Sequence, residues 1–213
     1  MQAYILLDRS GSMQSLWVEA LSSVNAFAKE LANKTDGPSV DSHVTLAVFD
    51  SQESLQFDTL RRKQPALHWE NVTDKDASPR GMTPLLDAMV RIISLAEGDN
   101  PDKAVIVVMT DGQENASREV TREGVKAALD RVKAKGWEVV FLGANFDNIA
   151  DASSVGVGGD KQMAMSAGTM GESMSRLAKK SRAYAQSAPG AAPIEFDAED
   201  RIAAKEANVK NKS

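Results

Sequence analysis

The stretch YILLDRSGSM (residues 4–13) joins an apolar run directly to a polar cluster. Four consecutive apolar residues are typical of a strand that is covered on both faces. Asp8, Ser10 and Ser12 follow this run, so they are expected at the carboxyl end of the strand. Open α/β sheets bind their ligands at that end. The stretch therefore predicts both a fold class and the place of a site.

The composition indicates one domain with a short appendage. The 213 residues are 42% hydrophobic and 5% aromatic, which is enough for one sizeable core. The formal net charge of −5, with acids and bases interspersed, argues against nucleic acid or an anionic membrane as the main partner. The absence of cysteine excludes disulfides, thiolate metal sites and cysteine nucleophiles. With no secretion signal and no run of about 18 apolar residues, we expect a cytoplasmic protein.

Strand and helix patterns alternate along most of the chain. This alternation predicts an α/β fold with a doubly wound, mostly parallel sheet and helices on both faces. The runs at 43–50 and 54–58 are too close for a crossover, so they predict one antiparallel edge strand. Residues 61–80 are expected to form a long surface connection. Further strands are expected at 103–112, 137–144 and 161–166, and helices at 15–33, from Pro84 onward, at 118–135, around 147–153 and at 169–186.

The last part of the chain has a different composition. Residues 1–186 are expected to form the domain, and residues 187–213 a flexible or partly helical tail, because few large apolar groups occur there. A transient helix is expected near 197–208. Deletion of the tail should change stability little; if the tail does pack, Ile194 and Phe196 are its expected anchors.

The polar cluster does not match the common catalytic motifs. A dehalogenase-type phosphotransferase needs a carboxylate at the position of Ser10, and a nucleophile elbow needs glycines two residues before and after its serine. His43 and His68 do not follow the end of a predicted strand, which argues against a Ser-His-Asp triad. Phosphate-binding and EF-hand patterns are also missing. We therefore expect no enzymatic activity from this cluster.

A site for a hard cation remains. Asp8, Ser10 and Ser12 alternate along one loop, so their oxygens can converge on one point. Thr83 lies just before a predicted helix and Asp111 ends a predicted central strand, which places two more oxygens on neighbouring loops. Mg²⁺ prefers oxygen ligands in octahedral geometry and retains water where carboxylates are few.

Three motifs occur in an order that resembles one family. They are D-x-S-x-S at Asp8 to Ser12, G-x-T-P at Gly81 to Pro84, and T-D-G at Thr110 to Gly112. Together they resemble the von Willebrand factor A (VWA) family and its metal-ion-dependent adhesion site, in particular the stand-alone bacterial or phage members. The resemblance covers roughly residues 1–186. It implies a doubly wound sheet with one antiparallel edge strand, in agreement with the hairpin at 43–58.

The resemblance also implies a ligand set and a cation. Ser10, Ser12 and Thr83 would be hydroxyl ligands, and Asp8 and Asp111 acidic ones, either of which could act through a water molecule. Mg²⁺ is the expected cation, with Mn²⁺ or Ca²⁺ as alternatives. Other acids on nearby loops are expected to be solvated and to have no ligand role: Glu53, Asp58, Asp74, Asp76 and Glu114.

These features predict a metal-dependent protein-binding module. At most two carboxylates would leave the cation incompletely coordinated, so an Asp or Glu side chain of another protein could complete the coordination. Substitution of Arg80 or Glu114 should then alter partner choice more than stability. One alternative is an accessory subunit that delivers substrates to an ATP-driven chelatase or AAA+ assembly, and a weaker one is a metal-dependent phosphoesterase. The partner and the oligomeric state stay open.

Overall fold

The computed structural model describes residues 1–33, 41–111, 113–144, 152–188 and 193–210. These residues contain a six-stranded sheet of order β3-β2-β1-β4-β5-β6. The β2–β3 pair is antiparallel and every other pair is parallel, which confirms the predicted fold class. The strands are β1 (Gln2–Asp8), β2 (His43–Ser51), β3 (Leu55–Pro65), β4 (Ala104–Thr110), β5 (Glu138–Gly143) and β6 (Gln162–Ala164).

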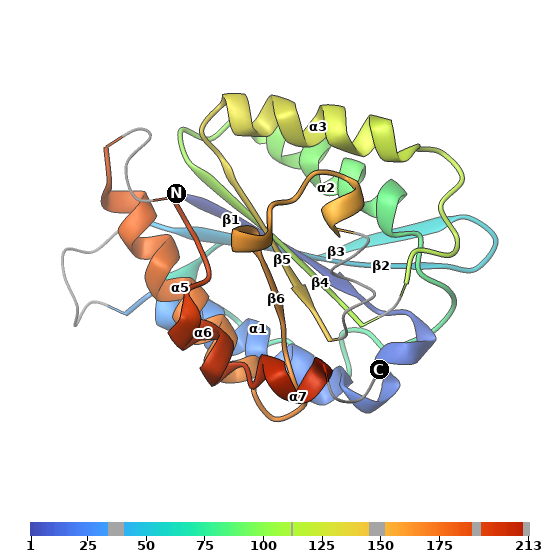
Figure 1. The fold of residues 1–213 in the computed structure, drawn as a ribbon, viewed down its shortest axis with the longest axis horizontal. Helices are drawn as coiled ribbons and strands as arrows, with labels where there is room; N and C mark the ends of the chain where they lie inside the picture. Colours follow the sequence, from blue (N-terminus) through green and yellow to red (C-terminus); the bar gives the residue numbers. More distant parts are fainter. Residues whose placement is uncertain (34–40, 112, 145–151, 189–192, 211–213) are drawn as a thin grey trace.

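Helices cover both faces of this sheet (Figure 1). One face carries α1 and α5, which pack against each other, and the other carries α2 and α3. The alternation along β1 explains the two layers, because Ile5 and Leu7 contribute to one core while Tyr4 and Leu6 contribute to the other. The main helices are α1 (Trp17–Leu31), α2 (Leu85–Asp99), α3 (Arg122–Ala134) and α5 (Met170–Gln186), and short 3₁₀ helices occur at η1 (Gly11–Ser15), η2 (Ala66–His68) and η3 (Gly159–Lys161).

The strand order reverses at β1. β2 pairs with one edge of β1 and β4 with the other, so the chain leaves β1 at a topological switch point. Leu7 is in register with Met109 of β4, which places the residues that follow these two strands side by side. The sheet therefore brings the Asp8 and Asp111 loops to the same edge.

The prediction of a surface connection at 61–80 is partly wrong. β3 continues to Pro65, since its backbone pairs with β2 as far as His43. The residues that follow are held in place by hydrogen bonds to their backbone. Arg61 donates to the carbonyls of Glu70 and Asn71, and Trp17 Nε1 donates to the carbonyl of Ala77. An edge strand is exposed on one side and so tolerates charges, which is why its pattern resembled a loop.

The third main helix begins at Arg122 and not near residue 118. Asp87 of α2 accepts hydrogen bonds from the N–H groups of Arg118, Glu119 and Val120, which holds that segment in a non-helical path. Thr121 then caps α3 by accepting from the N–H of Gly124. The short helix expected around 147–153 lies largely outside the described residues.

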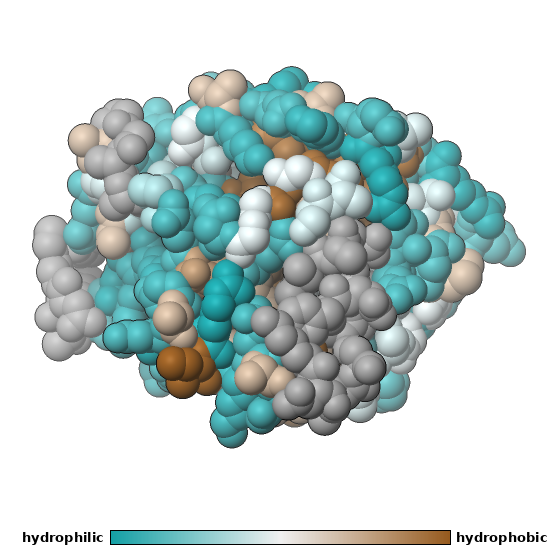
Figure 2. All heavy atoms as spheres, in the orientation of Figure 1, coloured by the Kyte–Doolittle hydropathy of each residue, from teal (hydrophilic) through white to brown (hydrophobic). Residues whose placement is uncertain are grey.

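The C-terminal segment packs on the domain. It contains two short helices, α6 (Ala198–Ala203) and α7 (Glu206–Lys210). Ile194 and Phe196 are 1% and 6% exposed, and the N–H of Phe196 donates to the carbonyl of Asp160. Ile202, by contrast, is exposed, and an apolar patch is visible over α6 in Figure 2.

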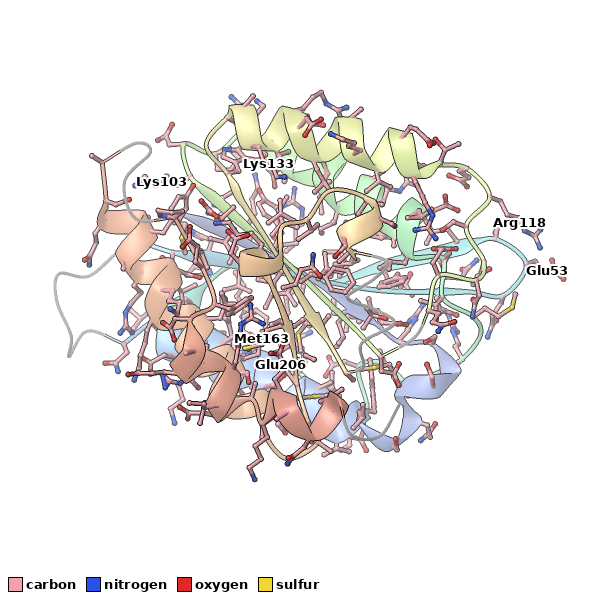
Figure 3. All side chains as sticks on the ribbon, viewed as in Figure 1. Glu53, Lys103, Arg118, Lys133, Met163 and Glu206 are labelled. Carbon is pink, nitrogen blue, oxygen red and sulfur yellow. The ribbon has the colours of Figure 1, made fainter. Side chains whose placement is uncertain are left out.

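Glu206 occupies the outer edge of the sheet. Its Oε1 accepts a hydrogen bond from the N–H of Ala164 in β6, at 3.1 Å. Figure 3 shows Glu206 of α7 beside Met163 of β6. The segment thus covers a backbone group that an edge strand would otherwise leave exposed.

Within the described part of the chain, no helix combines the length and the apolar character needed to cross a membrane.

Candidate metal centre

The loop after β1 holds three of the predicted ligands close together. Asp8 is the last residue of β1 and is fully buried, and its Oδ1 accepts a hydrogen bond from the N–H of Ser10 at 2.7 Å. The hydroxyls of Ser10 and Ser12 are 3.0 Å apart. Ser10 is buried and Ser12 is exposed, so the loop leads from the core to the surface within five residues.

The loop after β4 contributes the second carboxylate. Ser12 Oγ donates a hydrogen bond to Asp111 Oδ1, at 2.8 Å, although the two residues are 99 positions apart in the sequence. The preceding residue, Thr110, donates from Oγ1 to Asp8 Oδ2 at 2.5 Å. The loops after β1 and β4 are therefore joined by two side-chain hydrogen bonds.

Thr83 lies in a third loop that is tied to the other two by backbone contacts. It is 2% exposed, its N–H donates to Asn115 Oδ1 at 2.9 Å, and its carbonyl accepts from the N–H of Asn115. On the opposite side, the N–H of Gly11 donates to the carbonyl of Gly81 at 3.1 Å. All five predicted residues are thus at one end of the sheet, four of them joined by hydrogen bonds and Thr83 held by its neighbours.

Gly81 allows the third loop to approach this closely. Its φ is +69°, and a Cβ atom built there would lie 2.3 Å from the carbonyl oxygen of Ser51. Ser51 and Met82 exchange two backbone hydrogen bonds of 3.0 Å at the same place. Glycine is therefore required for the Thr83 loop to pack on the end of β2.

Both carboxyl groups are harder to ionise than usual. Burial raises the pKa of Asp8 to about 6, although hydrogen bonds from Thr110 and Ser10 oppose the shift; the nearby charge of Asp111 adds to it. Burial also raises the pKa of Asp111, against the hydrogen bond from Ser12. Two desolvated carboxylates that lie near each other are well suited to a cation.

The donor set fits a hard divalent cation. It consists of two carboxylates and three hydroxyls, and oxygen donors of this kind suit Mg²⁺ or Mn²⁺. The described residues contain no group of three or more His, Asp or Glu side chains placed to hold a metal, so hydroxyl ligands are essential to the candidate site. His43 begins β2 at the opposite end of the sheet, away from these loops.

Several acids that the sequence suggested were solvated have defined partners. Glu114 accepts hydrogen bonds from the N–H groups of Leu86, Ala116 and Ser117, which corrects that expectation. Asp76 accepts from Arg61 and from the N–H of Thr73. Glu114, Asp76 and Asp58 thus hold the scaffold of the loops through these contacts and through Arg9.

Exposed Asp58 contacts a charge pair, Arg9 and Asp50, that is buried and that the sequence analysis missed. Its Oδ2 lies 2.6 Å from Arg9 Nη2, and Arg9 Nε lies 2.6 Å from Asp50 Oδ1. Arg9 is the first variable residue of D-x-S-x-S, and Asp50 follows the apolar run of β2 in the same way that Asp8 follows that of β1. That repeated pattern was the available signal, because an acid after a second buried strand is expected at the same edge of the sheet.

Comparison with known proteins agrees with this geometry. Residues 4–180 match the family model of the von Willebrand factor type A domain. A search of curated proteins found no match. Among solved structures, the vWF domain of the type V pili tip protein Mfa5 from Porphyromonas gingivalis has a TM-score of 0.63 at 10% identity, over 88% of this chain and 96% of that one.

Two further structures are recorded with a bound metal. Mussel byssus proximal thread matrix protein 1 with a zinc-occupied MIDAS motif has a TM-score of 0.53 at 19% identity, over 84% of this chain and 46% of that one. Manganese-loaded TRAP protein of Plasmodium vivax has a TM-score of 0.51 at 15% identity, over 78% and 68%. The chain thus spans about half the length of the mussel protein, and at these identities the likeness concerns the fold.

Proposed function

Because the chain belongs to the von Willebrand factor type A family, we propose that it is a metal-dependent protein-binding module. A divalent cation, Mg²⁺ in the first instance, is held by Asp8, Ser10, Ser12, Thr83 and Asp111. When bound, the cation supplies a positive centre at the surface. An Asp or Glu side chain of a partner protein completes its coordination.

The convergence of two separate loops carries this proposal. Ser12 Oγ is 3.0 Å from Ser10 Oγ and 2.8 Å from Asp111 Oδ1, so donors from the β1 and β4 loops already lie within one coordination sphere of each other. Hydroxyls and carboxylates that are hydrogen bonded in this way can turn to a common cation with little movement. The zinc and manganese recorded in two structures of similar fold support a divalent cation.

The same donor set favours binding over catalysis. Three of the five donors are neutral, so the cation keeps much of its charge and attracts an anion. Hydrolysis would also need a base or nucleophile beside the metal. The two carboxylates of the set are both engaged in holding the loop hydroxyls and backbone. Recognition of an acidic side chain is the role that these groups support best.

Calorimetric and thermal titration with Mg²⁺ and Mn²⁺ tests the proposal. Cation bound only by the folded state adds about 2.7 kcal/mol at a hundredfold excess over Kd, so the Tm of chelator-treated protein should rise by several degrees. Ser12→Ala and Thr83→Ala should each reduce this response and leave the apoprotein folded. Ser22→Ala, at an exposed serine of α1, is the matched control and should respond like wild type.

Partner binding is tested separately by affinity capture with Mg²⁺ and with a chelator. A protein retained by the wild type only with Mg²⁺, and lost from Ser12→Ala, is the expected result. A wild-type protein whose Tm and calorimetric titration ignore millimolar divalent cations would contradict the proposed function.

A further inference from the structure

Arg9, Asp50 and Arg80 form a charge cluster around the buried carboxylate of Asp50, beside the candidate metal centre. Asp50 is fully buried at the end of β2. Its Oδ1 accepts from Arg9 Nε at 2.6 Å and its Oδ2 from Arg80 Nε at 3.2 Å. Each carboxylate oxygen thus receives one guanidinium, from two segments that are 71 positions apart in the numbering.

Each arginine lies next to candidate ligands. Arg9 stands between Asp8 and Ser10, and Arg80 stands three residues before Thr83. A backbone hydrogen bond also joins the two arginine segments, because the N–H of Arg80 donates to the carbonyl of Arg9 at 2.7 Å. The N–H of Arg9 in turn donates to the carbonyl of Phe49, the residue before Asp50. One carboxylate therefore links the loop of the two serines to the loop of Thr83.

We infer that Asp50, through Arg9 and Arg80, is a positioning residue that sets the cation affinity of the site. Asp50 itself contacts none of the five candidate ligands in the hydrogen bonds described. Its effect is to hold the hydroxyls of Ser10, Ser12 and Thr83 at the spacing that one cation requires. Partners of metal ligands act in this way, and their loss typically weakens metal affinity 10- to 100-fold.

A simple charge effect makes a different prediction from positioning. Asp50→Asn removes a negative charge near the site, so both explanations expect weaker cation binding. Arg80→Ala removes a positive charge, so charge alone expects tighter binding. Positioning expects weaker binding from both variants. The sign of the Arg80→Ala effect therefore separates the two explanations.

Asp99 offers a matched control at the other end of the sheet. It ends α2, its side chain is 8% exposed, and its Oδ1 lies 2.6 Å from both Arg62 Nη2 and Lys63 Nζ. Asp99→Asn thus also removes a largely buried carboxylate with two basic partners. It leaves the three loops of the candidate metal centre untouched.

The experiment is calorimetric titration of Mn²⁺ into chelator-treated, full-length protein at 15 °C, with circular dichroism to check that each variant is folded. Arg80→Ala and Asp50→Asn should each raise Kd at least tenfold, whereas Asp99→Asn should stay within about twofold of wild type. Arg80 is half-exposed, so Arg80→Ala decides the matter if Asp50→Asn does not fold.

Two results would overturn the inference while wild-type binding is normal. One is an unchanged or lower Kd in folded Arg80→Ala, and the other is an equal loss of affinity in Asp99→Asn, which would show a general effect of lost stability. The inference rests on the proposed function: wild-type protein that binds no Mn²⁺ would contradict that function itself, which is a different outcome from either of these.

Discussion

Thr110 donates a hydrogen bond to the buried carboxylate of Asp8, with 2.5 Å between Thr110 Oγ1 and Asp8 Oδ2. This contact stabilises the ionised form of Asp8, yet burial dominates and raises its pKa to about 6. The ordinary value of an aspartate is near 4. Ionisation of Asp8 at neutral pH therefore destabilises the metal-free protein.

Asp8→Asn should stabilise the metal-free protein at pH 7.5. A folded-state pKa above the unfolded one means that the stability contributed by Asp8 is present below pH 4 and is lost as pH rises through about 6. A shift of this size corresponds to about 3 kcal/mol, of which the neutral amide should recover about 1–2 kcal/mol. Chemical unfolding in chelator at pH 5 and pH 7.5 measures the difference, which should be larger at pH 7.5.

The companion substitution Thr110→Val should have the opposite effect on the stability of the metal-free protein. It removes a donor to the carboxylate, so it should lower apoprotein stability at pH 7.5 by about 1 kcal/mol. Asp8→Asn should also lose all response to Mn²⁺. An apoprotein made less stable at pH 7.5 by Asp8→Asn would contradict the electrostatic account of the site.

Asp99 should confer stability with the opposite pH dependence. Burial alone would raise its pKa, but hydrogen bonds from Arg62, Lys63 and Tyr4 outweigh it and lower the pKa to about 2. This contribution is therefore present above pH 4 and is lost as pH falls from 4 towards 2. Asp99→Asn should reduce the free energy of unfolding at pH 7 by about 2 kcal/mol. The difference between wild type and variant should shrink when unfolding is measured at pH 3.

Glu114 should matter for stability more than for partner choice. Its Oε2 accepts from the N–H of Leu86 in the first turn of α2, and its Oε1 accepts from the N–H groups of Ala116 and Ser117. Glu114→Ala should lower the free energy of unfolding by about 1–3 kcal/mol, since it removes the acceptor of the Ala116 and Ser117 N–H groups and an acid at a helix N-terminus; the N–H of Leu86 keeps its hydrogen bond to Ser117 Oγ.

The matched control is Glu119→Ala, at an exposed glutamate of the same connection. It should change the free energy of unfolding by less than about 0.5 kcal/mol. Urea unfolding of the two variants compares them directly. Equal free energies of unfolding for the two variants would show that Glu114 contributes no more to stability than a surface residue does.

The sequence predicted those parts of the molecule that depend on local patterns. The run from Tyr4 to Leu7 predicted β1, and three short motifs placed Ser12, Thr83 and Asp111 at one edge of the sheet. Both predictions follow from the spacing of apolar residues and from the order of the motifs, and a single sequence contains this information.

The charge cluster could not be predicted in the same way. The role of Asp50 depends on Arg9 and Arg80, which are 41 and 30 positions away, so the partners are defined only by the folded backbone. The charges of Arg61 and Arg62 also concealed the second half of β3, because an edge strand can carry them. The packing of Ile194 and Phe196 also depends on partners far along the chain, because a few apolar side chains suffice when hydrogen bonds accompany them.

Loss of the C-terminal segment is now expected to destabilise the domain. Deletion of residues 193–213 removes Ile194 and Phe196 from the core beside α5, and it removes the acceptor that Glu206 offers to the N–H of Ala164. Burial of one large apolar side chain is worth about 1.5–3 kcal/mol, so the Tm should fall by more than 5 °C. Differential scanning calorimetry of the full and shortened chains measures this.

Two single substitutions separate packing from length. Phe196→Ala should cost about 3 kcal/mol or more, because it empties a buried position. Ile202→Ala, at a side chain that is 76% exposed, should change stability by less than about 0.5 kcal/mol. If the shortened chain melts within 2 °C of the full one and Phe196→Ala matches Ile202→Ala, the segment contributes nothing to the fold. In the expected case, the uncovered edge of β6 should also make the shortened chain more prone to aggregate, which light scattering during the same heating would record.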